Sequence, residues 1–397
     1  MTGAQMTGAG MILPGATLGI LGGGQLGRMF VVAARSMGYA VVVLDPDADC
    51  PAAQLANRHI QAGYADQHAL NQLARACAAI TTEFENVPAS SLDYLAGMCP
   101  VRPAASALAV TQDRIREKNF LKLHGFDTAP FAAVEQRQAL DEALQQMAAP
   151  AILKTSRAGY DGKGQRRVRN LAEAETAFDK LGGTPCVLEA CIAIQTEISV
   201  LIARAVDGCV VAYPPSENGH REGILDVSIV PARISAGIGA RATQIAMRIA
   251  ELLDYCGVMA VEFFISEDGD LLVNEIAPRP HNSGHYTLDA CRTSQFEQQV
   301  RTLCGLPPGD AGLLGPAVMV NLLGDLWHAG QAPSWEQVLR HPRAKLHLYG
   351  KREARPGRKM GHYTVLGDSM EEALSLALAI QDALTRGGEP LLVREHG

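Results

Sequence analysis

The sequence predicts an α/β protein whose first domain is a doubly wound parallel sheet. Short apolar runs alternate with helical patterns early in the chain, as expected when crossover helices join parallel strands. Further along, the apolar runs 258–265 and 271–276 flank an acidic turn, which predicts a buried antiparallel hairpin. With 397 residues the chain is long enough for about two or three domains.

Composition and charge exclude several classes of protein. Apolar residues make up 47% of the chain and charged residues 19%, as in a soluble globular protein. No run of about 18 apolar residues occurs, so we expect no membrane span and no membrane partner. The formal net charge of −7 argues against a nucleic-acid partner, because phosphate contacts need a basic surface. Any anionic substrate must therefore meet a local basic patch.

Cysteine usage and the first residues bear on the cellular compartment. The nine cysteines form no CxxC pair, which favours a reduced, cytoplasmic chain over a disulfide scaffold or a zinc site. Residues 1–16 repeat MTGA and contain no Lys or Arg, so they lack the charged start of a signal peptide. We expect these residues to form a flexible leader.

A glycine-rich turn follows the first predicted strand. Thr17 to Leu21 is apolar and enters GGGQLG at residues 22–27, and a helical pattern runs from Arg28 to Met37. The next strand, Ala40 to Leu44, ends at Asp45, near the spacing of the ribose-binding acid in a dinucleotide site. Taken alone, this pattern favours an NAD-dependent reductase. A different phosphate is the alternative, because any helix start with free N–H groups attracts anions.

The remainder of the first domain continues the alternation. We expect a helix near residues 66–77, a strand over 78–84, a turn at 85–88 and then another helix. A doubly wound sheet is the economical arrangement of these elements. A further helical stretch between Ser106 and Gly125 leads out of the domain.

A loop rich in glycine and lysine follows a predicted strand at residues 150–155. The strand carries Lys154, and the next segment, SRAGYDGKGQ, holds three glycines within six positions with Lys163 among them. The backbone N–H groups of such a loop can fold over phosphates while lysine balances their charge. The spacing is not that of a Walker motif, and an ordinary hairpin loop is the alternative.

The acidic turn at residues 267–270 predicts the register of the hairpin. If Asp268 and Gly269 form a two-residue loop, Glu262 lies opposite Glu275, with both side chains on one face. Two carboxylates about 5 Å apart repel each other unless a cation or a shared proton lies between them. The apolar neighbours indicate buried strands, so Mg²⁺ is the expected partner. The alternative is a pair of carboxylates that point to solvent.

Polar residues crowd the end of the second hairpin strand. This run contains Arg279, His281, Asn282, Ser283 and His285. Such a density of polar groups just past a buried strand is typical of a substrate site.

A basic segment, HLYGKREARPGRKMGH, occupies residues 347–362. Five cations fall within nine positions, and Pro356-Gly357 prevents a helix, so we expect a basic loop. In a net-acidic chain this loop favours a site for a phosphate monoester. A nucleic-acid patch is the alternative, but no interleaved aromatic run accompanies the cations.

Four motifs appear in order along the chain: GGGQLGRM, KTSRAGYDGKGQ, NEIAPRPHNSGH and KREARPGRKMGH. Over roughly residues 17–393 the chain resembles the N5-carboxyaminoimidazole ribonucleotide synthetases of purine biosynthesis, which are ATP-grasp ligases. The resemblance implies an ATP-grasp fold in three parts behind the leader. These are a Rossmann-like domain over 17–125, a lid domain over 126–207 and a C-terminal α+β catalytic domain over 208–397.

The resemblance also implies a reaction. ATP and bicarbonate would carboxylate the exocyclic amine of 5-aminoimidazole ribonucleotide through carboxyphosphate. Bicarbonate is an anion with a poor leaving group, so it must first be phosphorylated, and Mg²⁺ would neutralise the γ-phosphate. The family further implies a homodimer in the cytoplasm.

The implied site residues fall into four groups. Those for the nucleotide are Arg114, Lys154, Gly159, Tyr160, Asp161, Gly162, Lys163, Gly164, Gln165, Glu189, Glu197, His220, Asn274 and Glu275. The implied metal ligands are Glu262 and Glu275. Those for the ribonucleotide are Gly24, Gln25, Asn282, Ser283, Lys351, Arg358 and Lys359, and those for catalysis are Arg279, His281 and Lys351. On the sequence alone, Arg114 could equally be a solvated helix charge, and a lone Glu189 or Glu197 a surface residue.

Two other classes of protein remain as alternatives. A formate- or bicarbonate-using ATP-grasp relative would share the metal chemistry but should lack the paired HNSGH and RPGRKMGH runs. An NAD-dependent dehydrogenase would explain only the first glycine turn and would leave the facing carboxylates without a role.

Overall fold

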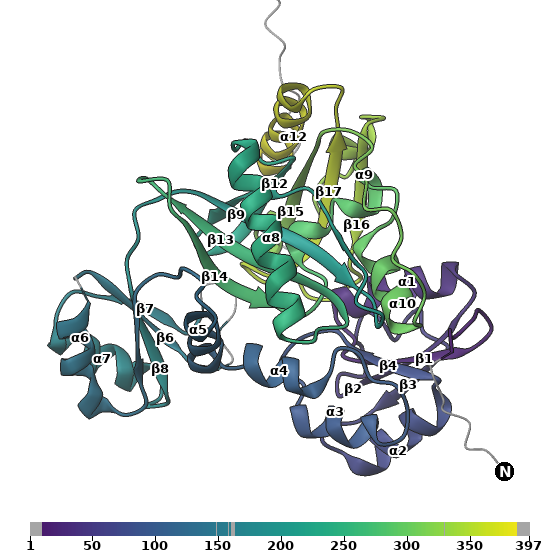
Figure 1. Ribbon diagram of the computed structural model, residues 1–397. Helices are drawn as coiled ribbons and strands as arrows, with labels where there is room; N and C mark the ends of the chain where they lie inside the picture. The colour runs from purple at the N-terminus through teal and green to yellow at the C-terminus, as the bar shows by residue number, and fades with distance from the viewer. Residues whose placement is uncertain (1–9, 148, 158, 160–162, 329, 387–397) are drawn as a thin grey trace, which may run out of the picture.

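The computed structural model describes residues 10–147, 149–157, 159, 163–328 and 330–386, which form three sheets with helices packed around them (Figure 1). Part of the expected leader lies in the described region. There the N–H of Ile12 donates to the carbonyl of Cys304, and the N–H of Gly15 donates to the carbonyl of Gly38. Residues 10–16 are therefore held against the fold, while residues 1–9 lie outside the described residues.

The N-terminal domain is the parallel sheet that the sequence predicts. Its strands lie in the order β3-β2-β1-β4. Their bounds, with those of the helices, are β1 Thr17–Leu21, α1 Gln25–Ser36, β2 Ala40–Asp45, β3 Arg58–Gln61, α2 Gln67–Ala76, β4 Ala79–Thr82 and α3 Ala89–Ala96. Helix α1 begins at Gln25, inside the glycine turn, rather than at the expected Arg28. No apolar run predicts β3, because Ile60 is its one buried residue.

Two short helices connect this domain to a small outlying sheet. They are α4 Ala105–Thr111 and α5 Arg114–Leu123, where we expected one helical stretch. The break falls at Asp113, whose carboxylate accepts from the N–H groups of Ile115 and Arg116 and so caps α5. The interruption fixes where α5 starts and therefore where Arg114 lies.

The outlying sheet, which we call the lid, projects away from the rest of the molecule at the lower left of Figure 1. Its four strands lie in the order β5-β8-β6-β7, and two helices pack on one face with a core that includes Leu153 and Phe178. The elements are β5 Phe131–Val134, α6 Leu140–Gln146, β6 Ala151–Thr155, β7 Gln165–Val168, α7 Leu171–Lys180 and β8 Cys186–Ala190.

A large mixed sheet receives the rest of the described chain. Within the described residues it has nine strands in the order β14-β13-β9-β11-β12-β15-β17-β16, with β10 paired to β9. Its strands are β9 Ile194–Arg204, β10 Val210–Ala212, β11 Ser216–Arg221, β12 Ile224–Val230, β13 Gly257–Ser266, β14 Leu271–Ala277, β15 Ala317–Leu323, β16 Ala344–Leu348 and β17 Lys359–Leu366. The helices are α8 Ala236–Leu252, α9 Thr287–Ala290, α10 Gln295–Leu303, α11 Glu336–Leu339 and α12 Met370–Thr385. No helix among the described residues has the length and apolarity to cross a membrane.

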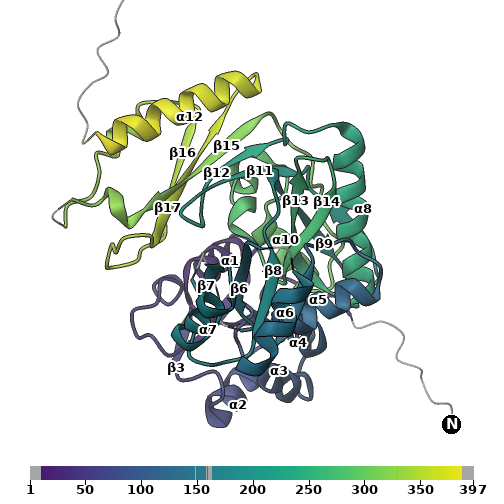
Figure 2. The same ribbon diagram turned by 90° about the vertical axis from the view of Figure 1, so that its left-hand side faces the viewer.

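Helices cover the two ends of the large sheet differently. Figure 2 shows α12 lying along β15, β16 and β17, while α8 packs beside β9 and β13. Helix α10 lies between the large sheet and the N-terminal domain, where Val300 and Leu303 share a buried cluster with Phe30 of α1. This shared core fixes the N-terminal domain against the large sheet.

Candidate active site

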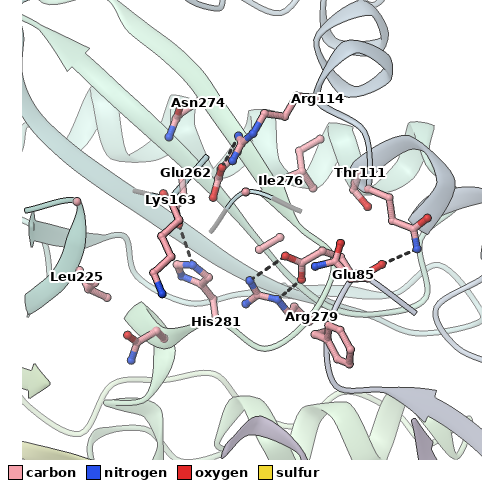
Figure 3. A pocket seen from close by; sticks show the side chains of 18 of the residues that line it. Glu85, Thr111, Arg114, Lys163, Leu225, Glu262, Asn274, Ile276, Arg279 and His281 are labelled. Carbon is pink, nitrogen blue, oxygen red and sulfur yellow. Dashed lines mark hydrogen bonds and ion pairs between the residues drawn. The ribbon is translucent and has the colours of Figure 1, made fainter. Parts of the chain in front are cut away.

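A cleft of about 700 Å³ is lined by residues from the N-terminal domain, the lid and the large sheet (Figure 3). This volume lies in the usual range for small-molecule sites. The expected site residues that line it are Gly24, Gln25, Arg114, Lys154, Gly159, Lys163, Gln165, Glu197, His220, Glu262, Asn274, Glu275, Arg279, His281, Asn282, Lys351 and Lys359. Four other described residues of the expected set lie outside the lining, namely Gly164, Glu189, Ser283 and Arg358. Tyr160, Asp161 and Gly162 lie outside the described residues.

The hairpin of β13 and β14 supplies the two facing carboxylates. Glu262 pairs with Glu275 across the strands, which confirms the predicted register at this point. The predicted two-residue loop is wrong, because Ser266 and Asp270 close a three-residue loop with Gly269 at a φ of +87°. Nearer the loop Phe263 pairs with Val273, so Asn274 is an extra, bulged residue. The bulge restores the pairing that a shorter loop would have given.

Each of the two carboxylates has a nitrogen partner from another element of the fold. Arg114 Nη1 lies 2.9 Å from Glu275 Oε2, and His281 Nε2 lies 2.8 Å from Glu262 Oε1 (Figure 3). Although burial alone would raise it, Arg114 lowers the pKa of Glu275 to about 2. The side chain is therefore ionised at neutral pH and available to a cation.

The carboxylate pair could hold a metal ion only together with other ligands. No group of three or more His, Cys, Asp or Glu side chains in the described chain is arranged to bind one. Two carboxylates that open onto a cleft fit Mg²⁺, which keeps waters and takes phosphate oxygens as its remaining ligands.

Lys154 reaches the cleft from β6 of the lid. Its Nζ lies 2.8 Å from Glu189 Oε2, and Lys118 Nζ lies 3.7 Å from the other oxygen of Glu189. Burial alone would raise the pKa of Glu189, but the two lysines lower it. Glu189 therefore acts as a buried counter-ion behind the cleft wall.

Glu197 and His220 face each other on β9 and β11. His220 Nδ1 lies 3.0 Å from Glu197 Oε2, and both residues line the cleft. Burial alone would lower the pKa of His220, but the hydrogen bond and charge of Glu197 raise it. The pair places an acceptor and a donor beside each other, as a site for sugar hydroxyls requires.

The loop between β6 and β7 contributes its described ends to the cleft. Gly159, Lys163 and Gln165 line it. Gly164 has a φ of +75°, and a Cβ there would lie 2.7 Å from Thr155 Oγ1, so the chain turn requires glycine.

The glycine turn of the N-terminal domain is occupied by the protein's own carboxylates. Glu83 accepts from the N–H groups of Gly24 at 2.5 Å and Leu26 at 3.0 Å, while Asp45 accepts from Gly23 at 2.7 Å. Burial raises the pKa of Glu83. These amides are the ones that would hold a pyrophosphate in a dinucleotide site. Their engagement argues against the NAD-dependent alternative.

The basic loop between β16 and β17 sends two of its lysines into the cleft. Lys351 Nζ donates to Gln25 Oε1 at 2.7 Å and to the carbonyl of Lys359 at 2.6 Å. Lys359 lines the cleft as well. The guanidinium of Arg358 instead donates to the carbonyl of Glu353 at 2.9 Å, in an exposed position. The structure therefore brings Lys351 and Lys359 together at the cleft but leaves Arg358 outside its lining.

The polar run after β14 divides between the cleft and the core. Arg279 lines the cleft and pairs with Glu85 at 2.5 Å, and His281 Nδ1 lies 2.8 Å from Ser283 Oγ. Ser283 is fully buried, and its hydroxyl also lies 2.6 Å from Ser199 Oγ. Ser283 therefore orients the His281 ring from the buried side of the cleft. His285 is also buried and lies outside the cleft lining.

Several residues that line the cleft or lie behind its wall are absent from the expected set. Glu85 follows β4 in a segment that the sequence marks only as a turn, yet it holds Arg279. Glu117 and Lys118 read as solvated charges of a helix, but each is buried. Burial and the neighbouring Glu275 raise the pKa of Glu117 to about 8. The position of Glu85 just after a strand is a signal in the sequence that could have identified it. The burial of Glu117 and Lys118 is visible in the folded structure alone.

Three family profiles cover most of the chain. Residues 15–112 match the ribonucleotide synthetase preATP-grasp domain, and residues 119–296 match the ATP-grasp domain. Residues 317–376 match the phosphoribosylaminoimidazole carboxylase C-terminal domain.

Curated relatives and solved structures agree with these profiles. The N5-carboxyaminoimidazole ribonucleotide synthase of Bacillus subtilis (strain 168) is 45% identical over 362 residues, which cover 91% of this chain and 94% of that protein. The synthase of that name from Brucella melitensis is 47% identical over 353 residues, with 88% and 96% covered. A crystal structure of an N5-carboxyaminoimidazole ribonucleotide synthetase with ADP superposes with a TM-score of 0.87 at 43% identity, covering 94% of this chain and 97% of that one. An Aspergillus clavatus synthase in complex with ADP and 5-aminoimidazole ribonucleotide gives a TM-score of 0.86 at 31% identity, with 94% and 99% covered.

Proposed function

The chain belongs to the N5-carboxyaminoimidazole ribonucleotide synthases, a family of ATP-grasp ligases, and we propose that its cleft carries out both half-reactions of that activity. The reaction is the ATP-dependent carboxylation of 5-aminoimidazole ribonucleotide on its exocyclic amine, in purine biosynthesis. One observation carries the assignment to this cleft, namely that Glu262 faces Glu275. Lysines of the lid and lysines of the C-terminal loop line the same cleft.

In the first half-reaction a bicarbonate oxygen attacks the γ-phosphorus of ATP, and ADP leaves with the electrons of the broken bond. Lys154 and Lys163 hold the phosphates, and Gly159 and Gln165 line the cleft beside them. Mg²⁺ between Glu262 and Glu275 would neutralise the γ-phosphate charge. Exclusion of water from the closed cleft protects carboxyphosphate from hydrolysis.

In the second half-reaction the amine nitrogen of the ribonucleotide forms a bond to the carboxyl carbon, and inorganic phosphate leaves. The nitrogen then loses a proton, for which His281 of the polar run is the proposed base. Arg279, held by Glu85, orients the carboxyl group. Lys351 and Lys359 bind the ribonucleotide phosphate, beside Gln25 of the glycine turn.

Three further features belong to the same proposal. We propose that the protein uses Mg²⁺, forms a homodimer and acts in the cytoplasm. The facing carboxylates of Glu262 and Glu275 support the first of these features. Glu197 and His220 lie on the ribose side of ATP, since they carry the acceptor and donor that sugar hydroxyls need. Arg358 contributes to the overall positive potential of the loop rather than to a contact in the cleft.

An ADP-release assay tests the proposed function. ADP formation should require bicarbonate and 5-aminoimidazole ribonucleotide together, and the carbamate product should accumulate in step with it. Formate in place of bicarbonate serves as the control for the other ATP-grasp alternative. ADP release that depends on formate, or that ignores the ribonucleotide, would contradict the assignment.

A further inference from the structure

Lys118 is a buried cation between the lid and the large sheet. Its side chain is only 2% exposed, and lysine is almost never fully buried without partners. It lies on α5, one helical turn after Arg114. Although both side chains approach the region of Glu275, Lys118 lies outside the cleft lining. Any influence of Lys118 on the reaction must therefore pass through its neighbours.

One of these neighbours is the strand that carries Glu275. The Nζ of Lys118 donates to the carbonyl of Asn274 at 3.0 Å, and Glu117 Oε1 accepts from the N–H of Ile276 at 2.5 Å. Among the described residues β14 is the edge strand of its sheet, with an isolated bridge from Thr128 to Val273 on its outer side. The outward groups at Asn274 and Ile276 bond to α5 in place of a neighbouring strand. Two successive residues of α5 thus hold the backbone on both sides of Glu275, at the bulge.

The other neighbour is the ion pair behind the lid wall of the cleft. Lys118 lies 3.7 Å from one oxygen of Glu189, whose other oxygen lies 2.8 Å from Lys154 Nζ. The Glu189 side chain is 3% exposed, so its charge is shared between the two lysines in a poorly hydrated site. Loss of Lys118 would leave Glu189 in its ion pair with Lys154 and would draw that amine away from the cleft.

We propose that Lys118 is a positioning residue that sets the spacing between Lys154 and Glu275. The inference rests on the function proposed above, in which these two groups hold the triphosphate and its metal ion. They come from different sheets, and Lys118 is the side chain that bonds to the supports of both. Phosphoryl transfer depends almost entirely on such placement, so a side chain outside the cleft can govern its rate.

The test replaces Lys118 with methionine, which keeps the length of the side chain and removes its charge. We expect Lys118→Met to lower kcat for ADP release about 10- to 100-fold, as for other residues that orient ligands. The KM for ATP and the Mg²⁺ requirement should rise, while the KM for the ribonucleotide stays the same. Arg137→Met is the matched control, because Arg137 forms its ion pairs with Glu175 and Asp179 on the exposed side of the lid.

A change in the KM for ATP alongside the fall in kcat distinguishes a positioning role from a structural one. A merely destabilised enzyme loses active molecules, which lowers the rate but leaves each KM unchanged. If Lys118→Met does not fold, Glu189→Gln removes the charge that Lys118 balances while keeping the side-chain shape, and the KM for ATP should again rise. In the folded double variant the two effects should not add, because both act through one ion pair. Wild-type ATP and Mg²⁺ constants in the folded Lys118→Met or Glu189→Gln protein would overturn the proposal.

Failure of the proposed function would be recognised separately. A wild-type protein that releases no ADP with bicarbonate and the ribonucleotide contradicts that function. Calorimetric titration with ATP and Mg²⁺ then still tests the role of Lys118. Weaker binding in Lys118→Met than in Arg137→Met supports it, and equal binding contradicts it.

Discussion

Arg114 and Glu275 form an ion pair of 2.9 Å although they lie 161 positions apart in the chain. The pair allows Glu275 to stay ionised opposite Glu262, whose Oε1 lies 2.8 Å from His281 Nε2. A metal ion that binds between the carboxylates would replace part of this compensation. The cleft therefore presents two facing carboxyl groups, each of which already has a nitrogen partner.

Removal of the charge of Glu275 should abolish most of the turnover without unfolding the protein. In Glu275→Gln the amide oxygen can still accept from Arg114, but one charge of the metal site is lost. We expect ADP release to fall on the order of 100-fold, with a melting temperature close to that of the wild type. Asp268→Asn, in the exposed hairpin loop, is the control. Wild-type ADP formation by Glu275→Gln would remove the pair from the metal site.

The basic loop offers a comparison between adjacent cations. Lys359 lines the cleft, whereas Arg358 does not. Lys359→Ala should raise the KM for the ribonucleotide about 10- to 100-fold, since one charge-assisted hydrogen bond is worth about 1.5 to 3 kcal/mol, and Arg358→Ala should change it little. The KM for ATP should stay the same in both variants. A larger effect in Arg358→Ala would show that the loop rearranges around the substrate.

His281 should act on the second half-reaction rather than on nucleotide binding. His281→Ala should still be stabilised against heat by ATP, because the groups that face the phosphates remain. Carbamate formation should fall about 100-fold, as expected when a general base is lost. Product and melting temperature are measured on the same sample, so a loss of about 1 kcal/mol of stability can be told from a loss of chemistry. A folded variant with near-normal product formation would exclude His281 from the mechanism.

The protonation of His220 provides a test that does not involve turnover. Because Glu197 raises its pKa, the ring should titrate above the ordinary value of about 6.5 in an NMR experiment. The stability gained from this pair is complete below that ordinary pKa and is lost as the pH rises through the raised pKa. In Glu197→Gln burial remains without the charge, so the pKa should fall below the ordinary value. His220→Asn identifies the signal, and an unchanged pKa in Glu197→Gln would contradict the assigned partner.

The sequence predicts the elements of this fold better than the contacts between them. Strand β1 has the expected bounds, because it is a compact apolar run with clear ends. The hairpin shows how a correct result can hide a local error. A longer loop and a bulge at Asn274 cancel each other, so Glu262 still faces Glu275. Neither irregularity follows from the alternation of apolar residues. That pattern does not reveal one extra residue in the loop or one at the bulge.

The candidate site is predicted where a motif lies at the end of a strand and missed where a charge is buried by tertiary packing. The run from Arg279 to Asn282 follows soon after β14, and Arg279, His281 and Asn282 line the cleft. Ser283 belongs to the same run but points into the core. Lys118 resembles any solvated helical lysine until α5 is placed between the lid and β14. Its burial depends on segments far away in the sequence.

The bond from Lys351 to Gln25 spans 326 positions, and Gln54 likewise reaches the carbonyl of Gly350 across 296. During synthesis from the N-terminus, the residues assigned to ATP and metal, from Arg114 to Glu275, leave the ribosome well before Lys351 and Lys359. The residues on the nucleotide side of the cleft are therefore synthesised before the lysines on its ribonucleotide side. A chain that ends ahead of β16 lacks both lysines of the basic loop that line the cleft.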